Sequence, residues 1–211
     1  SMASTPDRSA EAHGPDAGFW QARFESRATP WDRGRINPQL EAWLRSGLLK
    51  PHLNAEARAA GGDDPRLTRV LVPGCGSVHE VAMLAEWGFD VTGVDYAPAA
   101  TERTRSRLRS LLQSPNSEQV NRAEVVEADL LDYRPAVLFD AIYEQTCLCA
   151  LYPDDWCAYA DRLAGWLKPG GRLYALFMQA PRDGARAGYI EGPPYHCCPL
   201  YPSPSHRERT R

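Results

Sequence analysis

Between Arg69 and Gln179 the sequence alternates short β-rich runs with segments long enough to form helices, and this alternation constrains the fold more than any other feature. Successive strands joined by helices need crossover connections, which favour a parallel sheet with helices on both faces. We therefore predict an α/β, Rossmann-like fold with a mostly parallel sheet. Ligands of such sheets bind at the carboxyl ends of the strands, close to the point where the strand order reverses.

Five strands and the helices between them can be placed from the pattern. The expected strands are RVLVPGCG, FDVTGVDY, AEVVEADLLDY, FDAIYEQ and RLYALFMQ, at residues 69–76, 89–96, 123–133, 139–145 and 172–179. The expected helices cover 77–88, 98–113 and 153–167, and the last is followed by a turn at KPGG. Ser77 and Glu80 are spaced for a capping box at the start of the first helix, and Gly88 is placed to end it.

The rest of the chain adds an N-terminal part and a tail to this single domain. Residues 1–18 are small, polar and interrupted by Pro and Gly, which predicts disorder. Residues 19–198 form the domain, with an N-terminal lid and helix in 19–50 and the core in 69–179. Residues 199–211 are expected to form an irregular tail. The N-terminal helix starts near Pro38, with an apolar face made of Leu40, Trp43, Leu44 and Leu48.

Charge and hydropathy exclude several classes of protein. A formal net charge of −3 argues against broad binding to nucleic acid, whose phosphates usually require a basic surface. No apolar run approaches the roughly 18–20 residues that span a bilayer, so no membrane partner is expected. The first residues lack the apolar core of a secretory signal peptide, and we expect a cytoplasmic protein.

The six cysteines form no recognisable disulfide or metal pattern. None belongs to a C-x-x-C pair, and reduced intracellular thiols are the better interpretation. The cluster His196-Cys197-Cys198 is the only metal-like group in the sequence. Adjacent cysteines rarely ligate one ion in tetrahedral geometry, so we expect no metal.

A Gly-x-Gly turn, Gly74-Cys75-Gly76, ends the first predicted strand. A dinucleotide fingerprint needs a third glycine where this chain has His79, which disfavours a nicotinamide-dependent oxidoreductase. Asp95 ends the second strand, 19 residues after Gly76. A carboxylate in that place can accept hydrogen bonds from both hydroxyls of an adenosine ribose, and glycines let the backbone approach a ligand closely.

Asp129 ends the third predicted strand and is placed to reach an adenine amine, with Leu130 against the ring. Both carboxylates have a second interpretation. Asp95 can cap the helix that follows it, and Asp129 can cap a turn or lie in solvent.

Several motifs, in this order, carry a resemblance that runs over residues 20–199. They are Trp20, TPWDRGRINP, VLVPGCGSVHEVAMLAEWGFDVTGVDYAPAA, YEQTCLCALYP, WLKPGGRLYALFM and GPPYHC. In these motifs the chain resembles the thiopurine S-methyltransferase family, especially its bacterial members and the plant thiol/halide methyltransferases. The resemblance implies a class I methyltransferase fold, bound S-adenosyl-L-methionine, and methyl transfer to sulfur, halide or a related soft atom.

The resemblance also implies site residues. Cofactor contacts carry over to Trp20, Trp31, Gly74, Cys75, Gly76, Asp95, Asp129, Leu130 and Gln145. Trp31 and Tyr195 would wall the substrate pocket. Thiopurine-directed members place Arg where this chain has Gln145. This departure argues against a thiopurine or an anionic aromatic substrate.

Methyl transfer from a sulfonium is an in-line displacement, which needs alignment of the reacting atoms more than proton transfer. An aromatic face attracts a sulfonium as it attracts an ammonium, so Trp20 and Trp31 are candidates for that contact, although either can instead cover the core. A thiol with a pKa of about 8.5 is partly ionised at neutral pH. No general base is needed, and no catalytic residue is assigned.

After Gln179 the sequence departs from class I methyltransferases, which add a helix and an antiparallel hairpin there. The resemblance ends after Cys197, and PLYPSPSHRERTR cannot supply those elements. We expect the C-terminal strands to be missing or replaced, which would expose a sheet edge. The alternative function is a cofactor-binding but catalytically impaired homologue. We expect a monomer with a small-molecule thiol or halide-like substrate, unless the open edge drives dimerisation.

Overall fold

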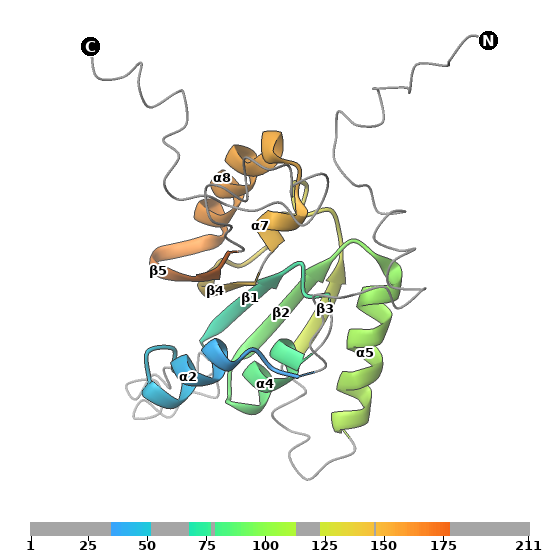
Figure 1. Cartoon of the computed structure of the whole chain (residues 1–211), viewed down its shortest axis with the longest axis vertical. Helices are drawn as coiled ribbons and strands as arrows, with labels where there is room; N and C mark the ends of the chain where they lie inside the picture. Colours follow the sequence, from blue (N-terminus) through green and yellow to red (C-terminus); the bar gives the residue numbers. More distant parts are fainter. Residues whose placement is uncertain (1–34, 52–67, 77–78, 113–122, 146, 178–211) are drawn as a thin grey trace, which may run out of the picture.

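A five-stranded sheet forms the centre of the chain (Figure 1). The computed structural model describes residues 35–51, 68–76, 79–112, 123–145 and 147–177. Within them the strand order is β3-β2-β1-β4-β5, and every neighbouring pair is parallel. The strands are β1 (Arg69–Pro73), β2 (Asp90–Asp95), β3 (Ala123–Glu127), β4 (Phe139–Gln145) and β5 (Leu167–Leu176). The prediction of an α/β fold with a parallel sheet is confirmed.

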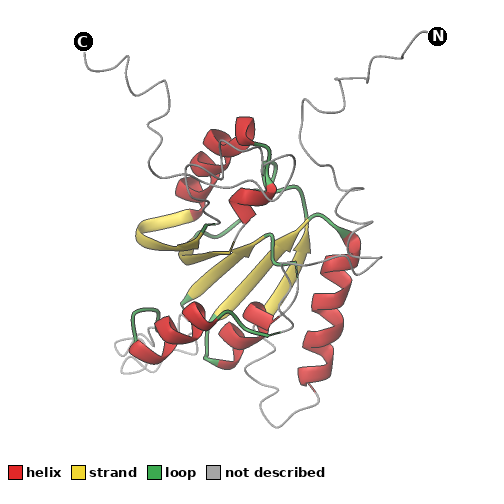
Figure 2. Cartoon of the chain, viewed as in Figure 1, coloured by secondary structure: helices red, strands yellow, loops and turns green. Residues whose placement is uncertain are grey.

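Helices cover both faces of this sheet, as Figure 2 shows in red against the yellow strands. They are α2 (Pro38–Ser46), α4 (His79–Glu86), α5 (Pro98–Leu112), the short α7 (Cys147–Ala150) and α8 (Trp156–Trp166), which follows a 3-10 turn, η1 (Pro153–Asp155). Successive residues of β1 alternate between two buried clusters. Val70 and Val72 pack with residues of α2 and α4, whereas Leu71 packs with residues of α8. The core therefore consists of two apolar layers, one on each face of the sheet.

Helix α2 begins and ends at residues suited to those positions. The Asn37 side chain accepts a hydrogen bond from the helix backbone (2.9 Å), and Gly47 ends the helix with a left-handed φ of 75°. Leu40 and Leu44 are buried as predicted. The prediction for Leu48 is wrong, because it follows the helix and is 52% exposed. The left-handed Gly47 turns the chain away from the apolar face just before this residue.

Helix α4 contacts α2 through Glu80. The Oε1 atom of Glu80 accepts a hydrogen bond from the backbone N–H of Asn37 (3.2 Å), so this carboxylate joins the starts of the two helices. Its predicted capping partner, Ser77, lies outside the described residues. Gly88 follows the end of α4 as predicted, with a φ of 100°, and its N–H donates to the carbonyl of Ala85 (3.0 Å).

The predicted turn at KPGG lies inside β5 and not before it. Phe139 of β4 pairs with Leu167, and Ala141 pairs with Arg172, so the residues in between bulge out of the ladder. Gly170, within this bulge, has a left-handed φ of 78° that glycine adopts without strain. Strand β5 pairs with β4 both before and after the bulge, and the turn residues are therefore part of the strand.

Within the described part of the chain, no helix is long and apolar enough to cross a bilayer. Across the same residues, no three His, Cys, Asp or Glu side chains are grouped so that they could hold a metal ion. The predictions of disorder in 1–18, of missing or replaced strands after Gln179 and of a tail in 199–211 fall outside the described residues, as does most of the lid expected within 19–50.

Candidate functional site

The carboxyl ends of β1, β2 and β3 are held together by backbone hydrogen bonds beyond the ladder itself. The N–H of Cys75 donates to the carbonyl of Val94 (3.1 Å), and the N–H of Ala128 donates to the carbonyl of Asp95 (3.0 Å). Strand β4 pairs with β1 on its other side, so the strand order reverses between these two strands. Ligands of open parallel sheets bind at such a point. The structure thus brings together the glycine turn, Asp95, Asp129 and Gln145.

The glycine turn follows β1 in a conformation that only glycine adopts easily. Gly74 and Gly76 have φ values of 58° and 47°. A Cβ atom on Gly74 would lie 2.7 Å from the Sγ atom of Cys147, the first residue of α7. The turn therefore packs directly against α7, and it presents backbone without side chains at two of its three positions.

Asp95 is buried at the end of β2, with 7% of its surface exposed. Its Oδ2 atom accepts a hydrogen bond from the N–H of Gly76 and its Oδ1 atom accepts one from the N–H of Ala97, both at 3.0 Å. Burial raises the pKa of this carboxyl above its usual value, although the backbone donors at Ala97 and Gly76 oppose the shift. Asp95 therefore fixes the glycine turn and the entry to α5. Each oxygen retains acceptor capacity, and the predicted ribose contact stays a prediction.

Cys75 points away from any open surface. It is buried, and its Sγ atom lies 3.1 Å from the place of a Cβ on Gly93, in the middle of β2. Burial, followed by the charge of Asp95, raises the pKa of the Cys75 thiol well above its usual range. Such a thiol stays protonated at neutral pH and is no nucleophile. Only the backbone of Cys75 is available for the predicted cofactor contact.

Asp129 and Leu130 lie in the turn after β3. Asp129 is exposed, and its Oδ1 atom accepts a hydrogen bond from the N–H of Leu131 (2.9 Å), which shapes this turn. Leu130 is buried in the same cluster as Val94 and Ile142. The side chain of Asp129 is accessible to a ligand, whereas that of Leu130 is committed to the core. Their predicted contacts with adenine stay predictions.

Gln145 is the last residue of β4 and is half-buried. Its Oε1 atom lies 2.6 Å from the hydroxyl of Tyr143, two residues earlier on the same face of the strand. The residue between them, Glu144, faces the other side and is fully buried. The Oε1 atom of Glu144 accepts a hydrogen bond from the N–H of Leu148 (2.6 Å) in α7.

The sequence analysis assigned no role to Tyr143 or Glu144 of β4, and it missed Cys147. No local pattern signals that a cysteine after β4 touches the turn after β1, because this contact depends on how α7 packs. Glu144 could have been noticed in the sequence, since a charged residue within a β-rich run is rarely fully buried unless it is paired. Burial raises the pKa of Glu144 to about 7.

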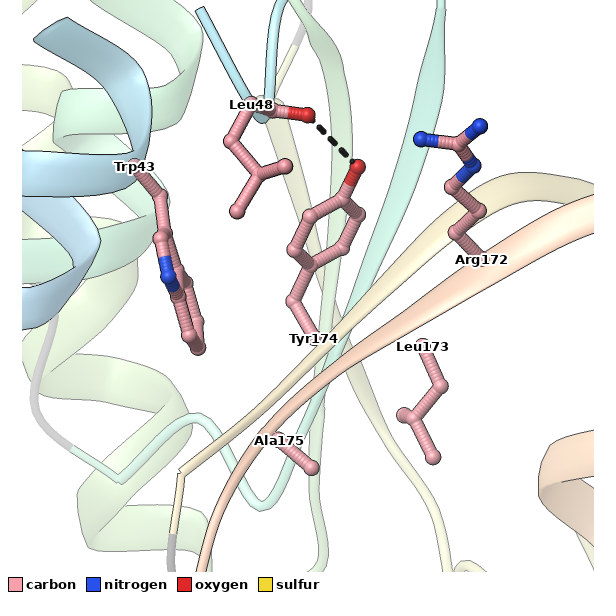
Figure 3. Close-up of a pocket in the computed structure, with 6 residues that line it drawn as sticks. All are labelled: Trp43, Leu48, Arg172, Leu173, Tyr174 and Ala175. Atoms are coloured by element: carbon pink, nitrogen blue, oxygen red, sulfur yellow. Dashed lines mark hydrogen bonds between the residues drawn. The ribbon is translucent and has the colours of Figure 1, made fainter. Parts of the chain in front are cut away.

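Three predicted residues, Trp20, Trp31 and Tyr195, lie outside the described residues. A pocket of about 480 Å³ opens elsewhere, between α2 and β5 (Figure 3). Its wall includes Trp43 and Tyr174, and the hydroxyl of Tyr174 donates to the carbonyl of Leu48 (2.9 Å). None of the predicted site residues that the structure describes lines this pocket.

Comparisons with known proteins identify the family. The family model of thiopurine S-methyltransferase (TPMT) matches residues 15–198. The chain is 32% identical to a probable thiol methyltransferase 2 and 29% identical to thiocyanate methyltransferase 1, both of Arabidopsis thaliana. Each match covers 85% of this chain and 67% of the relative.

The fold has a counterpart among solved structures. A 1,6-didemethyltoxoflavin-N1-methyltransferase of Burkholderia thailandensis superposes with a TM-score of 0.59 at 19% identity, covering 86% of this chain and 68% of that one. Its likeness establishes the class I methyltransferase fold, and the family match spans most of the sequence. The chain therefore belongs to the thiopurine S-methyltransferase family of S-adenosylmethionine-dependent methyltransferases.

Proposed function

We propose that this chain binds S-adenosyl-L-methionine at the carboxyl ends of β1 to β4 and transfers its methyl group to a small soft nucleophile, a thiol, a halide or a related chalcogen compound. The observation that carries this proposal is the hydrogen bond between Asp95 and Gly76, which joins a buried carboxylate to a turn without side chains. The relatives named as thiol and thiocyanate methyltransferases support the choice of acceptor.

The donor set at these strand ends suits the cofactor. Asp95 would hold the ribose hydroxyls, because a carboxylate can accept about four hydrogen bonds and its bonds from Gly76 and Ala97 do not fill them. Gly74 and Gly76 would let the cofactor approach the backbone, and Asp129 is exposed where an adenine amine could reach it. When bound, the cofactor supplies an electrophilic methyl group on a sulfonium.

Neither described thiol beside the site is a ready nucleophile. The thiols of Cys75 and Cys147 are buried and their pKa values are raised by that burial. A chain of this kind accelerates the reaction by holding the nucleophile in line with the methyl group. Nucleophiles that are already anionic, or that ionise readily, fit that requirement.

The first test is calorimetric titration with S-adenosylhomocysteine, with NAD as the control ligand. We expect saturable binding of the first ligand alone. In Asp95→Ala, loss of the ribose contact and of the tie to Gly76 should weaken binding at least about tenfold. The matched control is Asp90→Asn, at the opposite end of the same strand, where Asp90 forms a partly buried ion pair with Arg69.

Unchanged affinity in Asp95→Ala, or equal losses in the two variants, would contradict the assignment of the cofactor site.

In a second experiment iodide, hydrosulfide and thiocyanate are supplied as methyl acceptors, with a thiopurine for comparison. The proposal expects methylated products from the small anions. Turnover of the thiopurine alone would exclude the proposed acceptor class.

A further inference from the structure

The orientation of Gln145 is fixed from inside the protein. Gln145 and Tyr143 lie on one face of β4, and 2.6 Å separates the Tyr143 hydroxyl from Gln145 Oε1. An amide oxygen only accepts hydrogen bonds, so Tyr143 must be the donor. This bond holds the amide with its oxygen toward the core.

The packing around the Tyr143 side chain holds its hydroxyl in place. Tyr143 is fully buried, and its ring makes an edge contact with Trp43 of α2, with 6.3 Å between centroids and 81° between planes. Trp43 in turn packs against Tyr174 of β5 at 5.6 Å, an arrangement seen from the side in Figure 3. The hydroxyl also keeps its proton, because burial and the nearby charges of Glu80 and Glu144 raise the pKa of Tyr143 far above its usual range.

This arrangement leaves the amide nitrogen of Gln145 as the free branch. Among the described residues, no hydrogen bond engages that nitrogen. Gln145 is half-buried at the carboxyl end of β4, next to β1 and its glycine turn. With the oxygen bonded to Tyr143, the two N–H groups lie on the other branch of the amide, on the last residue of β4.

We propose that Tyr143 is a positioning residue that presents the Gln145 amide N–H groups to the methyl acceptor, so that the site selects small anions. This inference rests on the proposed function and adds a rule for choosing the acceptor. An N–H donor stabilises an anionic acceptor through a charge-assisted hydrogen bond, which is stronger than a bond to a neutral partner. The same donor adds little for a neutral thioether.

Calorimetric titration of thiocyanate into the complex with S-adenosylhomocysteine tests the inference without requiring turnover. In Tyr143→Phe the amide is free to rotate, and we expect thiocyanate affinity about tenfold lower. Affinity for S-adenosylhomocysteine should stay within about twofold. In Gln145→Glu the oxygen facing Tyr143 remains but the donors are replaced by a negative charge, so the loss should be larger.

Tyr174→Phe is the matched control. It removes one hydroxyl hydrogen bond from the same aromatic cluster without touching Gln145. Both affinities should stay within about twofold of the unmodified chain. A purely structural role of the cluster would instead weaken thiocyanate binding in both tyrosine variants alike.

Three outcomes would overturn the inference. The first is an unchanged thiocyanate affinity in Tyr143→Phe. The second is a loss of affinity for S-adenosylhomocysteine in that variant as large as its loss for thiocyanate. The third is that the unmodified complex binds no thiocyanate. If Tyr143→Phe does not fold, Gln145→Glu decides alone, and wild-type affinity in that variant rejects the idea. Failure of the unmodified chain to bind S-adenosylhomocysteine would instead reject the proposed function itself.

Discussion

Glu144 is the most unusual single residue of the protein, because a carboxyl group lies fully buried in an apolar layer. One oxygen accepts a hydrogen bond from the N–H of Leu148, and the other has no partner among the described residues. The hydroxyl of Tyr159 is buried in the same layer. Burial accordingly raises the pKa of Glu144 from 4.5 to about 7.

This shift predicts that stability depends on pH in a specific direction. The folded chain binds the Glu144 proton more tightly than the unfolded chain does, so its contribution is complete below about pH 4.5 and is lost as the pH rises through about 7. We expect the free energy of unfolding to fall by about 2 kcal/mol more between pH 5.5 and pH 8 in the unmodified chain than in Glu144→Gln.

Urea denaturation at the two pH values measures this difference. The glutamine keeps an oxygen for the N–H of Leu148 but cannot ionise. Glu86→Gln, on the exposed end of α4, is the control and should follow the unmodified chain. Parallel pH profiles in all three proteins would show that Glu144 does not titrate as described.

At the scale of elements, the contact between the glycine turn and α7 leaves no room for an added side-chain atom. A methyl group on Gly74 would meet Cys147 Sγ at 2.7 Å, and the φ of 58° adds strain for any other residue. Gly74→Ala should therefore lower the free energy of unfolding by about 2–3 kcal/mol. In the background of Cys147→Ala the same change should cost about 1 kcal/mol less, because the sulfur is gone.

Denaturant titration of the four proteins in this cycle gives the coupling energy. Gly47→Ala provides a reference for φ alone, since Gly47 has a φ of 75° with nothing within 4 Å of its Cβ position. Additive effects of Gly74→Ala and Cys147→Ala would mean that the turn and α7 do not press on each other.

The sequence was sufficient to predict most elements but not the contacts between them. The run 139–145 became β4 with the predicted bounds, because its apolar pattern and flanking residues are local signals. Helix α7 has only four residues, and the N–H of Leu148 within it donates to Glu144. Periodicity could not reveal so short a helix. The KPGG segment reads as a turn locally, and only pairing with β4 makes it part of β5.

The site shows the same division. Gly74, Asp95 and Gln145 could be placed at strand ends from the pattern, since parallel strands bring their carboxyl ends to one edge. The double use of Asp95, for Gly76 and for Ala97, could not be predicted, because both donors depend on the exact meeting of β1 with β2. The hydrogen bond between Tyr143 and Gln145 was likewise invisible without the packing of α2.

For the whole molecule, the labelling rates of exposed and buried thiols measure how readily the folded chain unfolds. Cys157 is exposed, whereas Cys75, Cys147 and Cys149 are buried. We expect a maleimide to label Cys157 at once and the three buried thiols only after unfolding. Saturating S-adenosylhomocysteine should slow the labelling of Cys75 and Cys147, because a ligand bound to the folded state stabilises it by mass action.

Peptide mass spectrometry after timed labelling resolves the individual cysteines, and Cys157→Ser removes the fast signal among the four described thiols. Labelling of Cys75 at the rate of Cys157 in the native protein would contradict the burial described here. Equal rates with and without S-adenosylhomocysteine would show that the ligand does not bind the folded chain.

Helix α2 comes early in the chain, but its partners come late. The N–H of Asn37, at its start, donates to Glu80. The carbonyl of Leu48, just after its end, accepts a hydrogen bond from Tyr174, which is 126 residues further along. During synthesis at about 5–20 residues per second, α2 has to wait several seconds until β5 leaves the ribosome. Throughout that interval Leu40 and Leu44 lack their final neighbours in the sheet. The nascent chain is thus most vulnerable to chaperones and proteases before β5 emerges, and a pause in translation ahead of Tyr174 would lengthen the exposure of α2.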